Sequence, residues 1–175
     1  ALSSYRGDVV VNSTAGPVVV SDVQGNGVNA SDGAATLDGL DLTDIRKYGV
    51  YAAYGDVVAS NVAITDVGVT GIYASYADIT GSDIQVETAG ASGIYASRGD
   101  INVSAGAGTL EVPDTVEHGV YAYRGDATVS GGEIVNTGNA GVQAYYGDVA
   151  VSNTSIQTTG SHGVVSQYGV ASTVS

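Results

Sequence analysis

Apolar and polar residues alternate along most of this chain at a spacing of two. Val57 and Ala59 follow this rhythm, and Val62 and Ile64 resume it after a short polar break. Successive side chains on a strand point to opposite faces, so a spacing of two predicts strands that bury one face. Gly, Asn, Asp and Ser separate the apolar runs, as is typical of turns. The pattern predicts an all-β protein of short strands.

The alternating pattern returns at a nearly fixed interval. Each copy opens on a phrase such as Gly-Val-Tyr-Ala-x-x-Gly-Asp, seen at 49–56 and, with Ile for Val, at 93–100. Copies start at residues 1, 27, 49, 71, 93, 119, 141 and 163, in steps of 22 residues apart from two steps of 26. A period of this size over a whole chain indicates a stacked repeat architecture.

Numbered from its glycine, one repeat has small apolar residues at positions 2, 4, 9, 11, 14 and 16. These positions predict three short strands per repeat, and three strands repeated in register form one coil of a parallel β-helix, with neighbouring coils about 4.8 Å apart. We therefore expect residues 1–175 to be a single β-solenoid domain of about eight coils. A β-sandwich is the alternative, but it does not explain why the same residue types return every 22 residues.

Two coils are longer than the others by four residues. The extra residues fall in 13–17 and in 105–114, and each stretch holds one of the two prolines, Pro17 and Pro113. Because proline cannot donate to a strand ladder, we expect both prolines outside the paired strands. These stretches are the candidates for irregular loops.

Composition limits the possible cellular location and binding partners of the protein. The chain contains no Met, from which we expect that an N-terminal signal has been removed and that Ala1 is the first mature residue; the alternative is that the chain is a fragment. No stretch approaches the 18 apolar residues of a membrane span. The net charge of −13 argues against nucleic-acid binding. Cysteine is absent, so no disulfide framework is expected.

Residues 147–164 read Gly-Asp-Val-Ala-Val-Ser-Asn-Thr-Ser-Ile-Gln-Thr-Thr-Gly-Ser-His-Gly-Val. This run resembles the passenger domains of bacterial autotransporter adhesins, and the same repeat pattern extends over the whole chain. The resemblance implies a right-handed coil and an extracellular or cell-surface location. The resemblance assigns no functional residue to this chain.

Position 8 of the repeat is a column of aspartates: Asp8, Asp56, Asp78, Asp100, Asp126 and Asp148. Stacked carboxylates repel one another, so something must compensate their charge. The favoured interpretation is that each Asp accepts hydrogen bonds from the backbone of its own turn. A row of Ca²⁺ ions is a weaker candidate, because Ca²⁺ prefers six to eight oxygen ligands. A catalytic pair would break the repeat instead of following it. No cofactor is therefore expected.

Three of the aspartates belong to an Arg-Gly-Asp tripeptide, the motif that integrins recognise. Other coils have Tyr in place of the Arg, as in Tyr54-Gly55-Asp56. The repeat therefore favours a plainer interpretation, in which the Arg side chains stack on tyrosines and pair with Asp.

Eleven of the twelve tyrosines fall at positions 3, 5 and 6 and are expected on one outer face together with Arg98 and Arg124. They are Tyr51, Tyr73, Tyr95 and Tyr121 at position 3, Tyr5, Tyr123 and Tyr145 at position 5, and Tyr54, Tyr76, Tyr146 and Tyr168 at position 6. This face is either a set of self-stacked ladders or an interaction face for neighbouring rods or sugar rings. His118 and His162 end their repeats two coils apart, too far to share a metal, and are expected to be turn residues.

The sequence favours a structural role over an enzymatic one. An active site would need a cluster of Asp, Lys, Arg or His, and Lys47 is the chain's single lysine. No cap is visible at either end, so both ends are expected to expose strand edges. The residues expected there are Ala1, Leu2, Gly163, Val164 and Val174.

The leading hypothesis is a secreted subunit that assembles head to tail into a filament or sheath. The alternative is the passenger or stalk of a surface adhesin that binds host or glycan surfaces.

Overall fold

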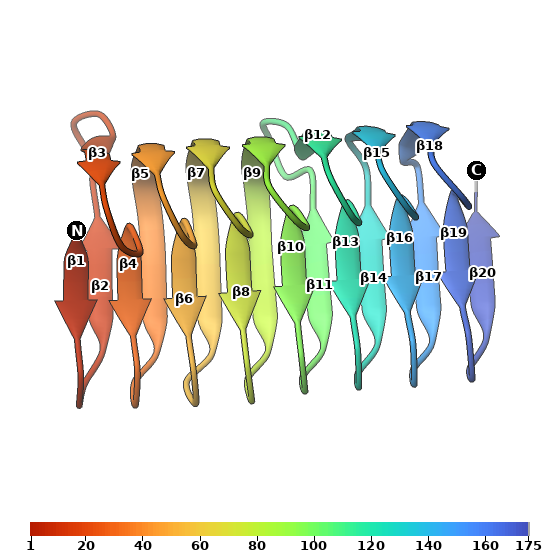
Figure 1. The fold of residues 1–175 in the computed structure, drawn as a ribbon, viewed down its shortest axis with the longest axis horizontal. Coiled ribbons are helices and arrows are strands. Elements are labelled where there is room, and N and C mark those ends of the chain that lie inside the picture. The colour runs from red at the N-terminus through yellow and green to blue at the C-terminus, as the bar shows by residue number, and fades with distance from the viewer. Residues whose placement is uncertain (175) are drawn as a thin grey trace.

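The computed structural model describes residues 1–174 as eight coils stacked along one axis, with the two termini at opposite ends (Figure 1). Coils 1 to 8 begin at the repeat starts that the sequence predicted. The first strands of the coils form an eight-stranded parallel sheet. Its strands are β1 (Leu2–Ser4), β4 (Val28–Ala30), β6 (Val50–Ala52), β8 (Ile72–Ala74), β10 (Ile94–Ala96), β13 (Val120–Ala122), β16 (Val142–Ala144) and β19 (Val164–Ser166).

The other strands form a twelve-stranded parallel sheet that bends around the rest of the coil. Coils 2 to 4 contribute one long strand each, namely β5 (Ala35–Ile45), β7 (Val57–Val67) and β9 (Ile79–Ala89). The remaining strands are β2 (Val9–Asn12), β3 (Val18–Val23), β11 (Ile101–Ser104), β12 (Glu111–Thr115), β14 (Ala127–Ser130), β15 (Glu133–Thr137), β17 (Val149–Ser152), β18 (Ser155–Thr159) and β20 (Ala171–Val174). The predicted second and third strands are thus continuous in coils 2 to 4.

Strand register confirms the predicted fold class. Val50 pairs with Ile72 and Tyr51 with Tyr73, so residues 22 positions apart lie side by side. Across the longer fifth coil the shift is 26, and Ile94 pairs with Val120. The extra residues therefore bulge outward without disturbing the ladders. The protein is an all-β parallel solenoid of eight coils.

Left-handed residues form two columns of corners along the rod. At position 13, Gly39, Asn61 and Asp83 have φ between 50° and 69°. A second column lies at position 18: Asp22, Asp44, Asp66, Thr88, Asp114, Asn136 and Thr158, all with φ between 52° and 58°. Gly, Asn and Asp tolerate this conformation better than other residues. These two columns let an 11-residue strand turn without losing its pairing.

Thr88 is a β-branched residue at one of these corners, where it has a φ of 58°. Because a β-branched side chain is strained in the left-handed region, we expect Thr88→Asn to raise the free energy of unfolding by about 1 kcal/mol. Thr65→Asn, one position before the corner in coil 3, is the control and should change stability by less than about 0.5 kcal/mol. Urea denaturation of both variants measures the difference, and equal effects would contradict this account of the corner.

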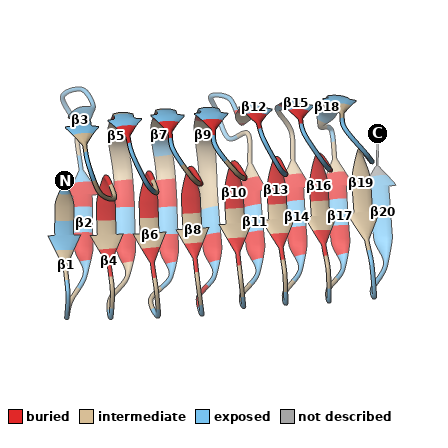
Figure 2. Cartoon of the chain, in the orientation of Figure 1, coloured by how far each residue is buried: buried red, intermediate tan, exposed pale blue. Residues whose placement is uncertain are grey.

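The core is formed by buried residues on the strands of successive coils (Figure 2). It contains only small and aliphatic side chains, such as Ala96, Ile94 and Val103, each fully buried. Burial falls at both ends of the rod. Leu2 and Val20 in the first coil, and Ile156 and Val164 near the last, are only partly buried.

The structure confirms the prediction for one of the two prolines and contradicts it for the other. Residues 13–17 separate β2 from β3, so Pro17 lies outside the paired strands as expected. The expectation for Pro113 was wrong, because it lies inside β12 and pairs with Val135. The pairing of β12 with β9 includes Glu111 and Thr115 but not Pro113. The strand thus accommodates Pro113 at a position where its pairing with β9 is interrupted. The inserted loop is therefore confined to residues 105–110.

Candidate functional site

The aspartates of position 8 form a hydrogen-bonded ladder between coils. Oδ1 of Asp78 accepts a hydrogen bond from the backbone N–H of Asp100 at 2.8 Å, and Oδ1 of Asp100 accepts one from Asp126 at 2.8 Å. Asp8, Asp56, Asp126 and Asp148 make the same bond to the following coil at 2.7–3.0 Å. The sequence correctly indicated backbone N–H groups as partners, but the bonds join neighbouring coils and do not close the residue's own turn.

This ladder explains why a column of carboxylates is tolerated. Each charge accepts a hydrogen bond from a backbone donor, and bonds to charged groups are stronger than neutral ones. Among residues 1–174, no three His, Cys, Asp or Glu side chains come together as a metal site would require. The column therefore offers Ca²⁺ only single, already hydrogen-bonded carboxylates.

Asp100→Ala should lower the free energy of unfolding by about 1 kcal/mol, because the N–H of Asp126 loses its acceptor at an exposed site. Asp100→Asn is the matched control. Its amide oxygen still accepts the bond, so about half of the loss should be recovered. Urea denaturation at neutral pH separates the two variants. An alanine variant as stable as the wild type would show that the ladder does not contribute to stability.

One tyrosine ladder lies on the first sheet. Rings of neighbouring coils are 5.0–5.6 Å apart along Tyr51, Tyr73, Tyr95 and Tyr121. Tyr48, which the sequence did not place on this face, joins it at 5.0 Å from Tyr73. Partial burial raises the pKa of Tyr121 to about 12, with smaller contributions from neighbouring tyrosines. The four rings of position 3 form a ladder of mutual contacts, stacked except for the edge-on pair Tyr73–Tyr95, as the structural interpretation proposed.

A second set of rings follows the exposed turn after the first sheet. Tyr54 stacks on Tyr76 at 5.4 Å, and Tyr146 stacks on Tyr168 at 5.1 Å. Two further rings, Tyr123 and Tyr145, stack beside them at 5.4 Å.

The arginines lie among these rings. The guanidinium of Arg98 lies 4.6 Å from the ring centre of Tyr76, and that of Arg124 lies 5.5 Å from Tyr123 and 5.9 Å from Tyr146. The predicted Arg–Tyr stacking is confirmed, so the Arg-Gly-Asp motifs fit the repeat's own packing.

His118 is only 8% exposed and stacks on Tyr121 at 4.6 Å, whereas His162 is exposed. Burial lowers the pKa of His118 below its ordinary value of 6.5, against a smaller opposite effect of Glu117.

As the pH falls through about 6.5, the unfolded chain takes up a proton that the folded chain does not, so stability should decrease. We expect His118→Gln to flatten the stability profile between pH 8 and 5.5. Denaturation at each pH tests this, and an unaltered slope in His118→Gln would contradict it.

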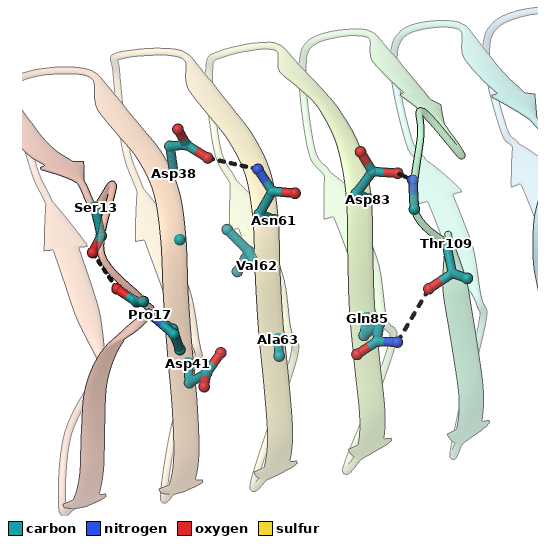
Figure 3. Close-up of a pocket in the computed structure, with 13 residues that line it drawn as sticks. Ser13, Pro17, Asp38, Asp41, Asn61, Val62, Ala63, Asp83, Gln85 and Thr109 are labelled. Atoms are coloured by element: carbon teal, nitrogen blue, oxygen red, sulfur yellow. Dashed lines mark hydrogen bonds between the residues drawn. The ribbon is translucent and has the colours of Figure 1, made fainter.

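The two inserted loops flank a shallow groove of about 490 Å³ on the second sheet. Figure 3 shows Ser13 and Pro17 at one end, Thr109 at the other, and side chains of β5, β7 and β9 between them. Among the residues that line it, three carry carboxylates: Asp38, Asp41 and Asp83.

Several polar groups of the groove bond to one another. Oδ1 of Asp38 accepts a hydrogen bond from Asn61 at 2.8 Å, and Oδ1 of Asp83 accepts one from the N–H of Gly108 at 2.7 Å. Gln85 donates to Thr109 at 3.1 Å. The sequence pattern did not indicate this groove as a unit. The available signal was that both insertions occur near the same position of the repeat, so that stacking brings them onto one face.

The residues predicted for the ends of the rod lie in its first and last coils, where Leu2, Gly163 and Val164 are half-buried. Leu2 lies on edge strand β1, and Val164 lies on β19 beside a hollow of about 590 Å³. This hollow is also lined by Val151, Ile156 and Gly163. Ala1 precedes β1 and is exposed. Val174 pairs with Ser152 through its backbone, and its side chain lies outside the described part of the structure.

Comparison with known families agrees with this geometry. Residues 24–175 match the model of the right-handed β-helix region. The chain belongs to this right-handed β-helix family. No curated protein and no solved structure matched the chain. Membership establishes a repeat solenoid and its hand, as the resemblance to passenger domains implied. Within residues 1–174 of this β-helix, no helix is long and apolar enough to cross a membrane.

Proposed function

We propose that this right-handed β-helix is a non-enzymatic, extracellular structural module that associates end to end with further copies of itself. The proposal rests on the unpaired strand edges of its two end coils. Edge strands β1 to β3 and β18 to β20 have a partner on one side only among the described strands. Unpaired strand edges are templates for pairing with another chain.

Apolar side chains support the same proposal. Leu2 and Val20 at one end, and Ile156 and Val164 at the other, are only partly buried, whereas their counterparts in the middle coils are fully buried. Stacking a second rod would bury these side chains and would continue the core. A contact between two different ends is heterologous and produces an open filament.

The groove favours a structural role over catalysis. None of its lining side chains is a His, Lys, Arg or Tyr, and two of its three aspartates are engaged in hydrogen bonds. General acid–base chemistry needs titratable groups that are free to exchange a proton with a substrate.

Blocking one edge tests the proposal. Val9 donates its N–H to the carbonyl of Ala34 in coil 2, so alternation places the N–H of Val10 on the free edge. The Val10 side chain is 66% exposed. Val10→Pro should therefore remove a donor from the free edge without breaking a bond inside the rod.

Pure Val10→Pro chains should form no fibres in light scattering and electron microscopy. Added to wild type at roughly one chain in ten, they should shorten the fibres several-fold, because each variant still binds through its other end. Val10→Ala keeps the N–H and should leave fibre length unchanged. Normal fibres from pure Val10→Pro would refute pairing through this edge.

A second candidate function is the passenger or stalk of a surface adhesin. The groove between the two inserted loops favours it, because it combines carboxylates, amides and two hydroxyls suited to hydrogen bonds with sugar hydroxyls. Asp41→Ala together with Gln85→Ala should then abolish the binding that the wild-type chain shows on a glycan array.

A further inference from the structure

Two columns of side chains follow the edge of the rod where the chain turns from the first sheet into the second (Figure 1). At position 6, four tyrosines are 49–68% exposed, and the arginines at this position are exposed as well. Phenol hydroxyls and guanidinium groups donate hydrogen bonds. We call these residues the donor column: Arg6, Tyr54, Tyr76, Arg98, Arg124, Tyr146 and Tyr168, in coils 1 and 3 to 8.

The second column lies two residues further along each coil. Its exposed carboxylates each accept one backbone hydrogen bond of the Asp ladder through Oδ1. A carboxylate accepts about four hydrogen bonds in all, so capacity remains for a partner. We call these residues the acceptor column: Asp8, Asp56, Asp78, Asp100, Asp126 and Asp148, in coils 1 and 3 to 7.

The residue types in the two columns are matched coil by coil. Wherever position 8 is Asp, position 6 of the same coil is Tyr or Arg. Coil 2 is the one coil with an acid at position 6, Asp32, and it has Ala34 at position 8. Coil 8 combines Tyr168 with Val170. Each coil can therefore face a second copy of itself across these columns without bringing two carboxylates together.

A two-fold axis parallel to the rod exchanges the two columns. It turns the edge of a second copy toward that of the first, keeps both chains in the same direction and leaves every coil at the same height. Position 6 of each coil then faces position 8 of the same coil in the second copy. An axis perpendicular to the rod would instead place each column opposite itself. We propose that this edge is a lateral docking surface for a second, parallel copy of the chain, in an isologous contact.

The symmetry fixes the register of this contact. Arg98 faces Asp100 of the second copy, Arg124 faces Asp126, and each such pair occurs twice. Arginine–carboxylate pairs are charge-assisted hydrogen bonds. The guanidinium of Arg98 stacks on the ring of Tyr76, and its N–H donors lie in its own plane, so stacking leaves donors for a carboxylate. Position 7, between the columns, is glycine in every coil except for Ala77, so small residues separate the two columns.

Charge favours a second copy over other partners. The donor column holds three of the chain's five basic residues, and a second copy presents carboxylates at the same spacing and in the same coils. The edge is about 35 Å long by strand spacing and two side chains wide. It thus buries less than the roughly 800 Å² per partner of a standard interface. The pair should therefore be weak for single rods and stronger between parallel filaments, where the contact repeats.

The contact goes beyond end-to-end association and is tested without it, in the Val10→Pro background or, if the ends do not associate, in the wild-type chain. Sedimentation equilibrium at high protein concentration should show monomers and dimers. Arg98→Glu should weaken dimerisation at least about fivefold, because it repels Asp100 at two symmetric places. The matched control is Arg46→Glu, which changes the net charge equally outside the two columns and should weaken it less than about twofold. Equal losses from both, or monomers at every concentration, would overturn the proposal.

A charge exchange tests the pairing itself. Asp100→Arg alone should weaken the dimer by about the same factor, because it faces Arg98 of the second copy. An equal mixture of Arg98→Glu and Asp100→Arg chains should dimerise to within about twofold of the unsubstituted chain, because every new charge then faces an opposite one. Urea denaturation identifies any variant that does not fold, and Arg124→Glu with Asp126→Arg then repeats the exchange in coil 6. Folded variants whose mixture stays monomeric would refute the pairing.

Spin labels test the direction of the two chains. The chain has no cysteine, so a single introduced cysteine carries the label. Asp32→Cys in coil 2 and Gln167→Cys in coil 8 lie six coils, or roughly 29 Å, apart along the axis. In a parallel dimer, each label should lie close to the same label of the second copy at both sites. An antiparallel pair brings at most one of the two sites close, and that result would reject the parallel contact.

Discussion

Gly119→Ala is expected to lower the free energy of unfolding by roughly 2–3 kcal/mol, a large effect for a single methyl group. A Cβ at residue 119 would lie 2.5 Å from Cγ2 of Ile134 and 2.7 Å from the carbonyl oxygen of Gly141. Ile134 is fully buried, and the Gly141 carbonyl accepts the ladder hydrogen bond of Val120. Neither atom can move away without disturbing the core or the sheet.

The matched control for this substitution is Gly25→Ala. A Cβ at residue 25 would meet no atom within 4 Å. Urea denaturation should therefore show a change of less than about 0.5 kcal/mol for Gly25→Ala. A similar small change for Gly119→Ala would mean that coils can separate locally at little cost, and that the first column of glycines is not a packing requirement.

Ile94→Ala is expected to cost about 3 kcal/mol, through lost burial and the cavity that remains. Ile94 is fully buried in coil 5, with paired strands on both sides. A cavity there weakens the contacts of both neighbouring coils, because each coil of a solenoid contacts only its neighbours.

The same substitution near the end of the rod provides the comparison. Ile156 lies in coil 7 and is only partly buried. Ile156→Ala should therefore cost about half as much as Ile94→Ala. Thermal and urea denaturation of both variants test this, and equal losses would show that coil 7 is as well packed around Ile156 as the middle of the rod is.

The repeat made most of the fold predictable. Glycines such as Gly49 and Gly71, followed by Val50 and Ile72, fixed the coil starts and hence the register of every ladder. The left-handed corners were visible only as turn residues, because a sequence pattern does not report φ. Thr88 shows this limit, since its residue type argues against the conformation that it adopts.

The candidate surfaces were less predictable. The aspartate column was evident, but its hydrogen bonds cross to the next coil, and only coordinates show that Asp78 bonds to the N–H of Asp100. Pro113 entered a strand because a gap in one ladder removed the need for its donor. The groove depends on two loops four coils apart, and stacking alone brings Pro17 and Thr109 onto the same face.

End-to-end assembly is the central claim, and electron microscopy of the purified chain at neutral pH tests it most directly. Light scattering should be recorded across a dilution series of the same sample. Long unbranched fibres that shorten on dilution are the predicted result, because stacking joins two different ends. Dispersed short rods at high concentration would contradict the claim, and the adhesin interpretation would then take its place.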